Sequence, residues 1–122
     1  MSVIVVGYSD KPEGQAALDT AIKAATDRHS QLVVVHTLAT PEEVTALAQT
    51  LAQTGLEHQV KAAADPHDPA EEVLASAERT NADFIVMGLK KRSPVGKLLL
   101  GSNAQRVLLD AACPVLAVKA PT

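Results

Sequence analysis

Short apolar runs alternate along the chain with longer stretches in which apolar residues recur every three or four positions. The runs are typical of strands buried on both faces, and the longer stretches are typical of helices with one buried face. The pattern predicts strands at residues 3–7, 32–38, 57–63, 84–88 and 114–118. Residues 57–63 alternate polar and apolar side chains more than the other strands, which predicts a place at the edge of a sheet.

Helices are expected between successive strands, and three of them have a proline in the first turn, where its missing N–H costs nothing. These prolines are Pro12, Pro41 and Pro69. In the first helix, an apolar stripe is expected to face the core, formed by Ala17, Leu18, Ala21, Ile22 and Ala25. In the last helix, the corresponding stripe is Ala104, Val107, Leu108 and Ala111.

Two helix starts have the spacing of a capping box, in which a short polar side chain and a glutamate three residues later cap each other's N–H groups. Thr40 with Glu43 is the first, and Asp68 with Glu71 is the second. The helix that begins after Thr40 is predicted to run to about residue 54 and to stop at Gly55.

Five strands with a helix between each successive pair predict an α/β protein with parallel pairing, because each connection is long enough to cross over the sheet. Helices on both faces would explain why the strands are almost wholly apolar. The expected fold is a doubly wound, five-stranded parallel sheet. The length of 122 residues is typical of a single domain, here residues 1–122.

Composition narrows the function classes. Eleven Lys and Arg against fourteen Asp and Glu give a net charge of −3, and Tyr8 and Phe84 are the only aromatic residues. Neither a basic face nor a stacking platform is expected, which argues against nucleic-acid binding. No apolar run is long enough to span a membrane, and residues 1–10 lack the features of a signal peptide, so a cytoplasmic protein is expected.

Several candidate reactive groups have simpler interpretations. Cys113 cannot form an internal disulfide, and its apolar surroundings favour a buried, inert thiol. His36 lies in an apolar run and is expected to be a hydrogen-bonded strand-end histidine rather than a base. His58, His67, Asp65 and Asp68 do not have the spacing of a standard metal site. Without a nucleophile and base at a recognisable spacing, no catalytic residue and no enzyme activity are predicted.

In a doubly wound sheet, ligands bind beyond the carboxyl ends of the strands, where the strand order reverses. The segments 7–10 and 88–93 leave the first and fourth strands, and Gly101-Ser102-Asn103 opens the last helix. A helix start with free N–H groups and a glycine for close approach can hold a phosphate. The alternative is a plain N-cap, Ser102 or Asn103, after a glycine hinge.

The chain also resembles the universal stress protein family. The resemblance rests on Met87-Gly88, a basic loop, the run 98–102 that ends in Gly101-Ser102, and Cys113-Pro114-Val115-Leu116. It implies a Rossmann-like fold of the adenine nucleotide alpha hydrolase type and a cytoplasmic stress-response protein.

In nucleotide-binding members of that family, the motif reads glycine, two residues, glycine, nine residues, glycine, then serine or threonine. Gly88 and Gly101-Ser102 match it, whereas Lys91 stands at the second glycine. The family's aspartate after the first strand corresponds to Ser9, with Asp10 one position away. A lysine at residue 91 would hinder a close backbone approach, but its ammonium could neutralise phosphate charge.

The resemblance therefore implies an adenine nucleotide, ATP with Mg²⁺, at the reversal of strand order. Met87 and Val35 would lie against the base, and Ser9 or Asp10 near the base or the ribose. The residues expected near the phosphates are Gly88, Lys91, Gly101, Ser102 and Asn103.

The last strand, Val115-Leu116-Ala117-Val118, is apolar throughout although it is expected at a sheet edge. A bare edge has unpaired N–H and C=O groups and favours pairing with another chain. Relatives dimerise through this strand, so a homodimer is expected, the alternative being an edge covered by the chain's own terminus. Two other functions stay open: a nucleotide-free protein-interaction module, and a slow phosphohydrolase.

Overall fold

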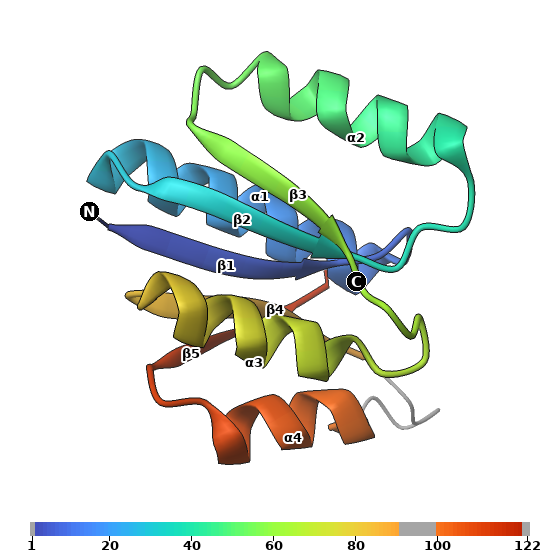
Figure 1. Cartoon of the computed structure of the whole chain (residues 1–122), viewed down its shortest axis with the longest axis vertical. Coiled ribbons are helices and arrows are strands. Elements are labelled where there is room, and N and C mark those ends of the chain that lie inside the picture. The colour runs from blue at the N-terminus through green and yellow to red at the C-terminus, as the bar shows by residue number, and fades with distance from the viewer. Residues whose placement is uncertain (1, 91–99, 121–122) are drawn as a thin grey trace.

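The computed structural model describes residues 2–90 and 100–120, in which a five-stranded sheet is flanked by helices (Figure 1). The strands are β1 (Val3–Tyr8), β2 (Gln31–His36), β3 (His58–Ala62), β4 (Phe84–Leu89) and β5 (Val115–Lys119). The helices are α1 (Pro12–Arg28), α2 (Pro41–Ala52), α3 (Pro69–Thr80) and α4 (Ser102–Asp110). Each strand agrees with its predicted segment to within a residue or two, the usual uncertainty of an element boundary.

The strand order is β3-β2-β1-β4-β5, and every neighbouring pair is parallel. In the middle of the sheet, Val5 of β1 lies opposite Val33 of β2 and Ile85 of β4. The predicted fold class, a doubly wound parallel α/β sheet, is confirmed. Because the chain moves outward from β1 to β3 and then returns to β4, the order reverses between β1 and β4.

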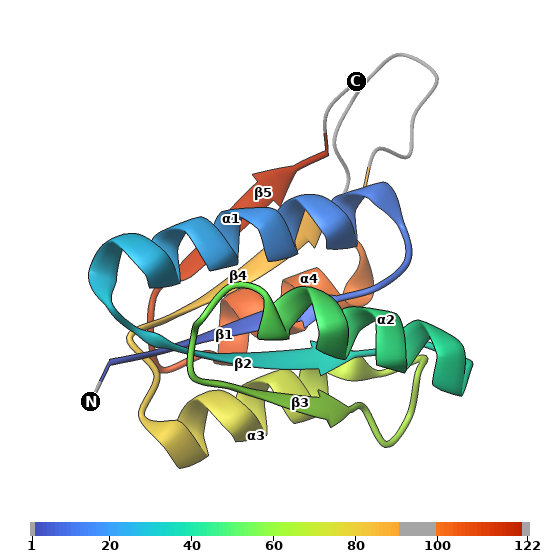
Figure 2. The ribbon, with the colours of Figure 1, turned by 90° about the horizontal axis from the view of Figure 1, so that it is seen from above.

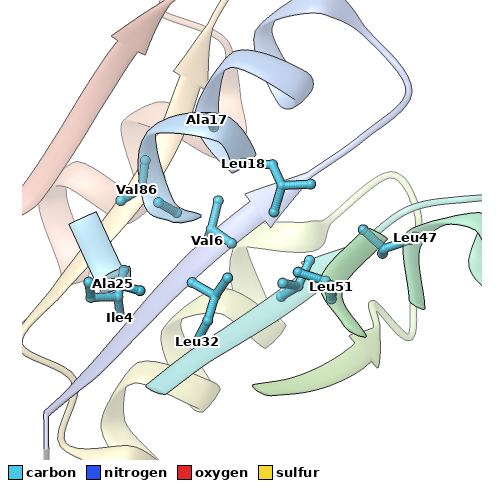
Figure 3. Close-up of a cluster of buried hydrophobic side chains, with 11 residues drawn as sticks. Ile4, Val6, Ala17, Leu18, Ala25, Leu32, Leu47, Leu51 and Val86 are labelled. Carbon is cyan, nitrogen blue, oxygen red and sulfur yellow. The ribbon is translucent and has the colours of Figure 1, made fainter. Parts of the chain in front are cut away.

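Helices cover both faces of the sheet (Figure 2). On one face α1 and α2 pack on Ile4, Val6 and Leu32 of the sheet. Figure 3 shows this apolar layer, to which Leu18 of α1 also belongs. The remaining labelled side chains of the layer are Ala17, Ala25, Leu47, Leu51 and Val86. On the other face α3 and α4 cover a second layer that contains Val3, Val5, Val35, Ile85, Val73 and Val107.

Alternation along β1 explains the two layers, since successive side chains point to opposite faces of a sheet. Ile4, Val5 and Val6 are each completely buried, and burial of a side chain of this size stabilises the fold by about 1.5–3 kcal/mol. The alanines of α1 carry no side chain beyond Cβ, so this helix can lie close to the sheet. The last predicted stripe is only partly correct, because Leu108 of α4 is 40% exposed.

The two predicted capping boxes have different outcomes. At α2 the box is present: the N–H of Glu43 donates to Thr40 Oγ1, and the N–H of Thr40 donates to Glu43 Oε1, both at 3.2 Å. At α3 the prediction is wrong, because the Asp68 side chain caps no N–H group of the helix in the described structure. Its carboxylate instead accepts two hydrogen bonds from Arg106, each 3.1 Å long.

Helix α2 ends at Ala52, earlier than predicted. The N–H of Thr54 donates to the carbonyl of Leu51 at 3.1 Å, a tighter turn than an α-helix makes. Gly55 then adopts a positive φ of 74°, which reverses the chain toward β3.

Candidate functional site

A cavity of about 420 Å³ lies at the carboxyl ends of β1 and β4, where the strand order reverses. Its walls come from the β1–α1 connection, the end of β4, and the first turns of α3 and α4. Of the residues predicted for the site, those that line this cleft are Ser9, Asp10, Met87, Gly88, Gly101, Ser102 and Asn103. Lys91 lies outside the described residues, whereas its neighbour Lys90 lines the cleft.

Val35 does not line the cleft, contrary to the prediction. Its side chain is completely buried beneath α3, in the same layer as Val73 and Ala77. Thr37, which directly follows the last residue of β2, lines the cleft at this strand end. The sequence pattern did not indicate Thr37 as a site residue, because it predicts a strand that continues to Leu38 and so places Thr37 inside the strand.

Close packing against α1 shapes the first wall. A Cβ on Gly14 would overlap Ser9, including the main-chain N and O of that residue. The glycine therefore allows the β1–α1 connection to rest on the first turn of α1, while Ser9 Oγ accepts the N–H of Lys11 at 3.3 Å. Sequence reasoning missed Gly14. The available signal was a glycine inside a predicted helix, where it is unfavourable by about 1 kcal/mol relative to alanine.

Gly88 has a packing role as well. A Cβ at this position would overlap the main-chain carbonyl group of Glu13, so the end of β4 and the start of α1 can meet only if residue 88 has no side chain. This contact explains why the fold requires a glycine at the first position of the motif, even without a ligand. It also sets the position of Met87 and Gly88 along the cleft.

The first turn of α4 forms the opposite wall. Gly101 is the N-cap residue, with φ −67° and ψ 166°, and no described side chain caps this helix end. The alternative prediction of Ser102 or Asn103 as the N-cap is therefore wrong. The first hydrogen bond along the helix runs from the N–H of Gln105 to the carbonyl of Gly101, at 3.0 Å. The N–H groups before Gln105 have no partner within the helix, as at any helix start.

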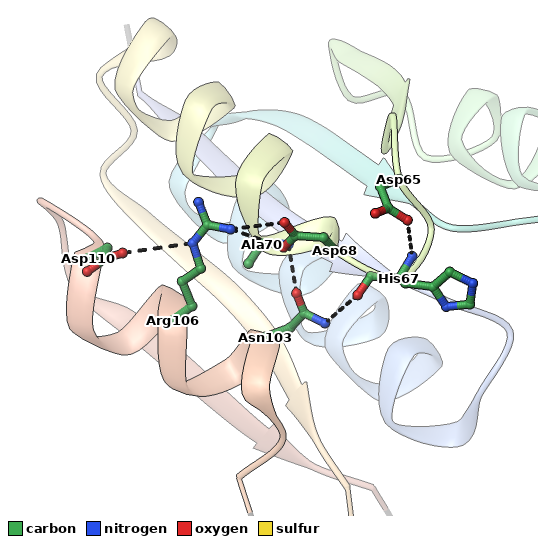
Figure 4. Close-up of polar contacts among 7 residues, drawn as sticks. All are labelled: Asp65, His67, Asp68, Ala70, Asn103, Arg106 and Asp110. Carbon is green, nitrogen blue, oxygen red and sulfur yellow. Dashed lines mark hydrogen bonds and ion pairs between the residues drawn. The ribbon is translucent and has the colours of Figure 1, made fainter.

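The side chain of Asn103 turns from α4 toward the start of α3 (Figure 4). Its Nδ2 donates to the carbonyl of His67, and its Oδ1 accepts the N–H of Ala70, both at 3.3 Å. Since both ends of the amide are engaged, the group that Asn103 keeps for a ligand is its main-chain N–H.

Charges of both signs surround the cleft. Lys11 and Lys90 carry positive charge, and Asp10 and Glu13 carry negative charge. Burial raises the pKa of Tyr8, and the nearby carboxylates of Asp10, Asp19 and Glu43 raise it further, so the phenol is neutral at pH 7.

The other candidate groups are held in local contacts. His36 is buried and accepts the N–H of Leu38 on Nδ1 at 3.1 Å, which confirms a hydrogen-bonded strand-end histidine. Burial lowers the pKa of His36, so the ring is neutral at pH 7. Cys113 is half-buried, and burial raises the pKa of its thiol, which is therefore protonated at that pH.

Two of the carboxylates weighed as metal ligands have protein partners. Asp65 Oδ1 accepts the N–H of His67 at 2.9 Å, and Asp68 is paired with Arg106. Across residues 2–90 and 100–120, no three His, Cys, Asp or Glu side chains come together as metal ligands. None of the helices described here is both long and apolar enough to cross a membrane.

Comparison with known proteins agrees with this geometry. A model of the universal stress protein family matches residues 1–67 and 41–119. A universal stress protein of Mycolicibacterium smegmatis is 40% identical over 129 residues, which cover 96% of this chain and 97% of the relative.

Solved structures show the same fold. A universal stress protein from Archaeoglobus fulgidus superposes with a TM-score of 0.72 and 28% identity, covering 98% of each chain. A structure of the universal stress protein from the same organism in complex with dAMP superposes with a TM-score of 0.67 and 23% identity, again over 98% of each chain. With the family model matching nearly the whole sequence, this chain belongs to the universal stress protein family.

Proposed function

We propose that this protein is a stress-response protein that binds an adenine nucleotide in the cleft between the ends of β1 and β4. The observation that carries the proposal is the first turn of α4, where Gly101, Ser102 and Asn103 line the cleft. The cleft has about 420 Å³, within the range of about 300–1,000 Å³ found for small-molecule sites. Its position corresponds to the general ligand site of doubly wound sheets.

The phosphates would lie against the start of α4. The N–H groups of a first turn carry a partial positive charge, and no side chain at Gly101 stands between them and a ligand. Lys90 adds a full positive charge at the same cleft. Lys91 is proposed to add another, in place of the glycine that the family motif has there.

The base and the ribose would lie at the β1 side of the cleft. Met87 and Thr37 offer one apolar and one polar contact, and Ser9 and Asp10 offer hydroxyl and carboxylate oxygens to the ribose. The complex of a family member with dAMP supports an adenine nucleotide as the ligand class. Mg²⁺ would enter with ATP, held mainly by phosphate oxygens and water.

Binding, rather than bond cleavage, is the proposed activity, and the protein is proposed to signal from the cytoplasm through its dimer state. The edge strand β5 favours dimer formation, since it pairs only with β4 among the described strands and leaves Leu116 45% exposed. The same surface favours the second candidate function, a protein-interaction module that needs no nucleotide.

Thermal unfolding with ATP and Mg²⁺, and in parallel with AMP, tests nucleotide binding. A ligand at 100 times its dissociation constant adds about 2.7 kcal/mol to the free energy of unfolding. For a domain of this size, we expect Tm to rise by about ten degrees.

The matched control is Gly101→Val. The φ and ψ of Gly101 suit any residue, so valine should not strain the backbone, and we expect its larger side chain at the N-cap to hinder the approach of a phosphate to the first turn of α4. The variant should fold with nearly the wild-type Tm and should lose the shift with ATP. An unchanged wild-type Tm at millimolar ATP would contradict the proposal and leave the interaction module as the better hypothesis.

A further inference from the structure

Two contacts join the start of α4 to the start of α3 (Figure 4). The first is the Asn103 bridge, meaning the pair of hydrogen bonds from the Asn103 amide to the carbonyl of His67 and the N–H of Ala70. The second lies one turn further along α4, where Arg106 donates to both carboxylate oxygens of Asp68.

The Asn103 bridge supplies a hydrogen-bond acceptor to an N–H group at the start of α3 that has no acceptor within its own helix. Ala70 is in the first turn of α3, so its N–H has no partner within the helix, and the residue is only 1% exposed. A buried N–H left unpaired costs about 1–3 kcal/mol. Asp68 holds the N-cap position but is turned toward Arg106, and the amide of Asn103 supplies the missing acceptor from another helix.

An amide is suited to this position because one group must accept and donate at once. Oδ1 accepts the N–H of Ala70, while Nδ2 donates to the carbonyl of His67. An aspartate would keep the acceptor and lose the donor, and an alanine would lose both.

The segments joined in this way form two walls of the same cleft. Pro66, Pro69 and Ala70 line it from the α3 side, and Gly101 and Ser102 line it from the α4 side. Asn103 and, further along α4, the pair of Arg106 with Asp68 join these two walls, beside the apolar packing of Ala70 and Val73 with Val107.

We propose that Asn103 is a positioning residue whose side chain holds the first turn of α4 in place for the ligand and makes no contact with the phosphates. This inference rests on the proposed nucleotide binding. It identifies a residue that positions the first turn of α4 for the nucleotide. A site held in its bound arrangement loses less freedom when the ligand binds. Loss of the bridge should therefore weaken nucleotide binding without removal of a ligand contact.

The bridge is tested first in the ligand-free full chain, by hydrogen exchange of the Ala70 amide measured by NMR. We expect Asn103→Ala to exchange this amide faster than the wild type does. Leu109→Ala is the matched control, because Leu109 lies on the same helix and is 82% exposed. Equal exchange at Ala70 in the wild type and in Asn103→Ala would overturn the bridge, whether or not the protein binds nucleotide.

The positioning role is tested by ATP affinity, measured by calorimetry. Asn103→Ala should weaken binding about two- to tenfold, the range that loss of a hydrogen bond gives. Asp68→Ala should also weaken binding. This direction is informative because removal of a nearby negative charge by itself favours an anionic ligand. An Asp68→Ala variant that binds ATP as well as or better than the wild type would overturn the role of this second contact.

A double variant separates positioning from direct binding. If both side chains act by joining α3 to α4, the effects of Asn103→Ala and Asp68→Ala on the dissociation constant do not multiply, because the residues share one task. If Asn103 bound phosphate directly, the two effects would multiply, and the inference would be wrong.

The outcomes also separate this inference from the proposed function. A wild type that does not bind ATP contradicts the proposed function, and the exchange of Ala70 still decides whether the bridge exists. A wild type that binds ATP, together with an Asn103→Ala variant of equal affinity and faster Ala70 exchange, contradicts the positioning role alone. Should Asn103→Ala not fold, Asn103→Ser replaces it, since this variant also removes the amide but keeps a small, uncharged polar side chain in the first turn of α4.

Discussion

At the scale of single residues, the cleft depends on positions where a side chain is excluded. Gly14 and Gly88 both lie against main-chain atoms of the β1–α1 region, and a Cβ at either position would overlap them. By contrast, a Cβ on Gly7 would lie 3.7 Å from Cγ2 of Val73, an ordinary contact. Glycines that look alike in the sequence therefore differ in how strictly the fold requires them.

Gly88→Ala should destabilise the protein by about 1–3 kcal/mol, the typical effect of overpacking, because the added methyl must displace the backbone at Glu13. Gly7→Ala is the control and should change the free energy of unfolding much less. Urea unfolding of both variants measures the difference. Equal stability of the two variants would show that β4 and α1 can separate without cost.

His36 should make stability depend on pH. Burial lowers its pKa in the folded protein, whereas the unfolded chain has the ordinary value of about 6.5. Below that value the unfolded state binds more protons than the folded state, so this contribution to stability is present above about pH 6.5 and is lost as the pH falls toward the folded pKa.

We expect the wild type to lose more unfolding free energy than His36→Gln when the pH falls from about 7.5 to about 5.5. Urea unfolding at the two pH values measures both losses. Equal losses in the two proteins would assign the pH dependence to other groups.

At the scale of elements, the starts of α2 and α3 look alike in the sequence but are stabilised in different ways. Thr40 and Glu43 cap α2 from within the same segment. Helix α3 receives its acceptor from Asn103, which is 33 residues away from Ala70 along the chain. Local capping can be read from residue spacing, and capping from another helix cannot.

Thr40→Ala should cost about 1 kcal/mol, because it removes an N-cap side chain. Asp68→Ala should cost less, about 0–1 kcal/mol, since it removes only a half-exposed ion pair with Arg106. Chemical denaturation of the two variants compares them directly. A larger loss for Asp68→Ala would mean that its carboxylate caps α3 in solution.

At the scale of the whole molecule, the parallel sheet brings residues from distant segments to one edge. The ends of β1 and β4 lie side by side although about 80 residues separate them, because their pairing is fixed by the register of Val6 with Val86. The two outer strands leave edges, and β5 is the apolar one.

Leu116→Glu should shift the proposed dimer toward the monomer, because it places a charge on the apolar edge strand. Sedimentation analysis at several protein concentrations measures this shift. Leu109→Glu, on α4, is the matched control and should leave the association unchanged. If Leu109→Glu dissociated the dimer and Leu116→Glu did not, the contact between subunits would lie on α4 and not on β5.

Much of this architecture is determined by the sequence, because hydrophobic periodicity and local capping act over a few residues. The strands, the helices, the box at Thr40 and the edge position of β3 all follow from such short-range rules. So does the position of the cleft, since parallel strands present their carboxyl ends at one edge of the sheet.

Tertiary structure decided what depends on residues far apart. Val35 belongs to the core because α3 covers it, and Thr37 lines the cleft in its place. Gly88 packs on Glu13 and Asn103 caps α3, and neither partner can be found from spacing along the chain. Periodicity tells which face of an element is buried, whereas only the packed fold determines which atoms meet that face.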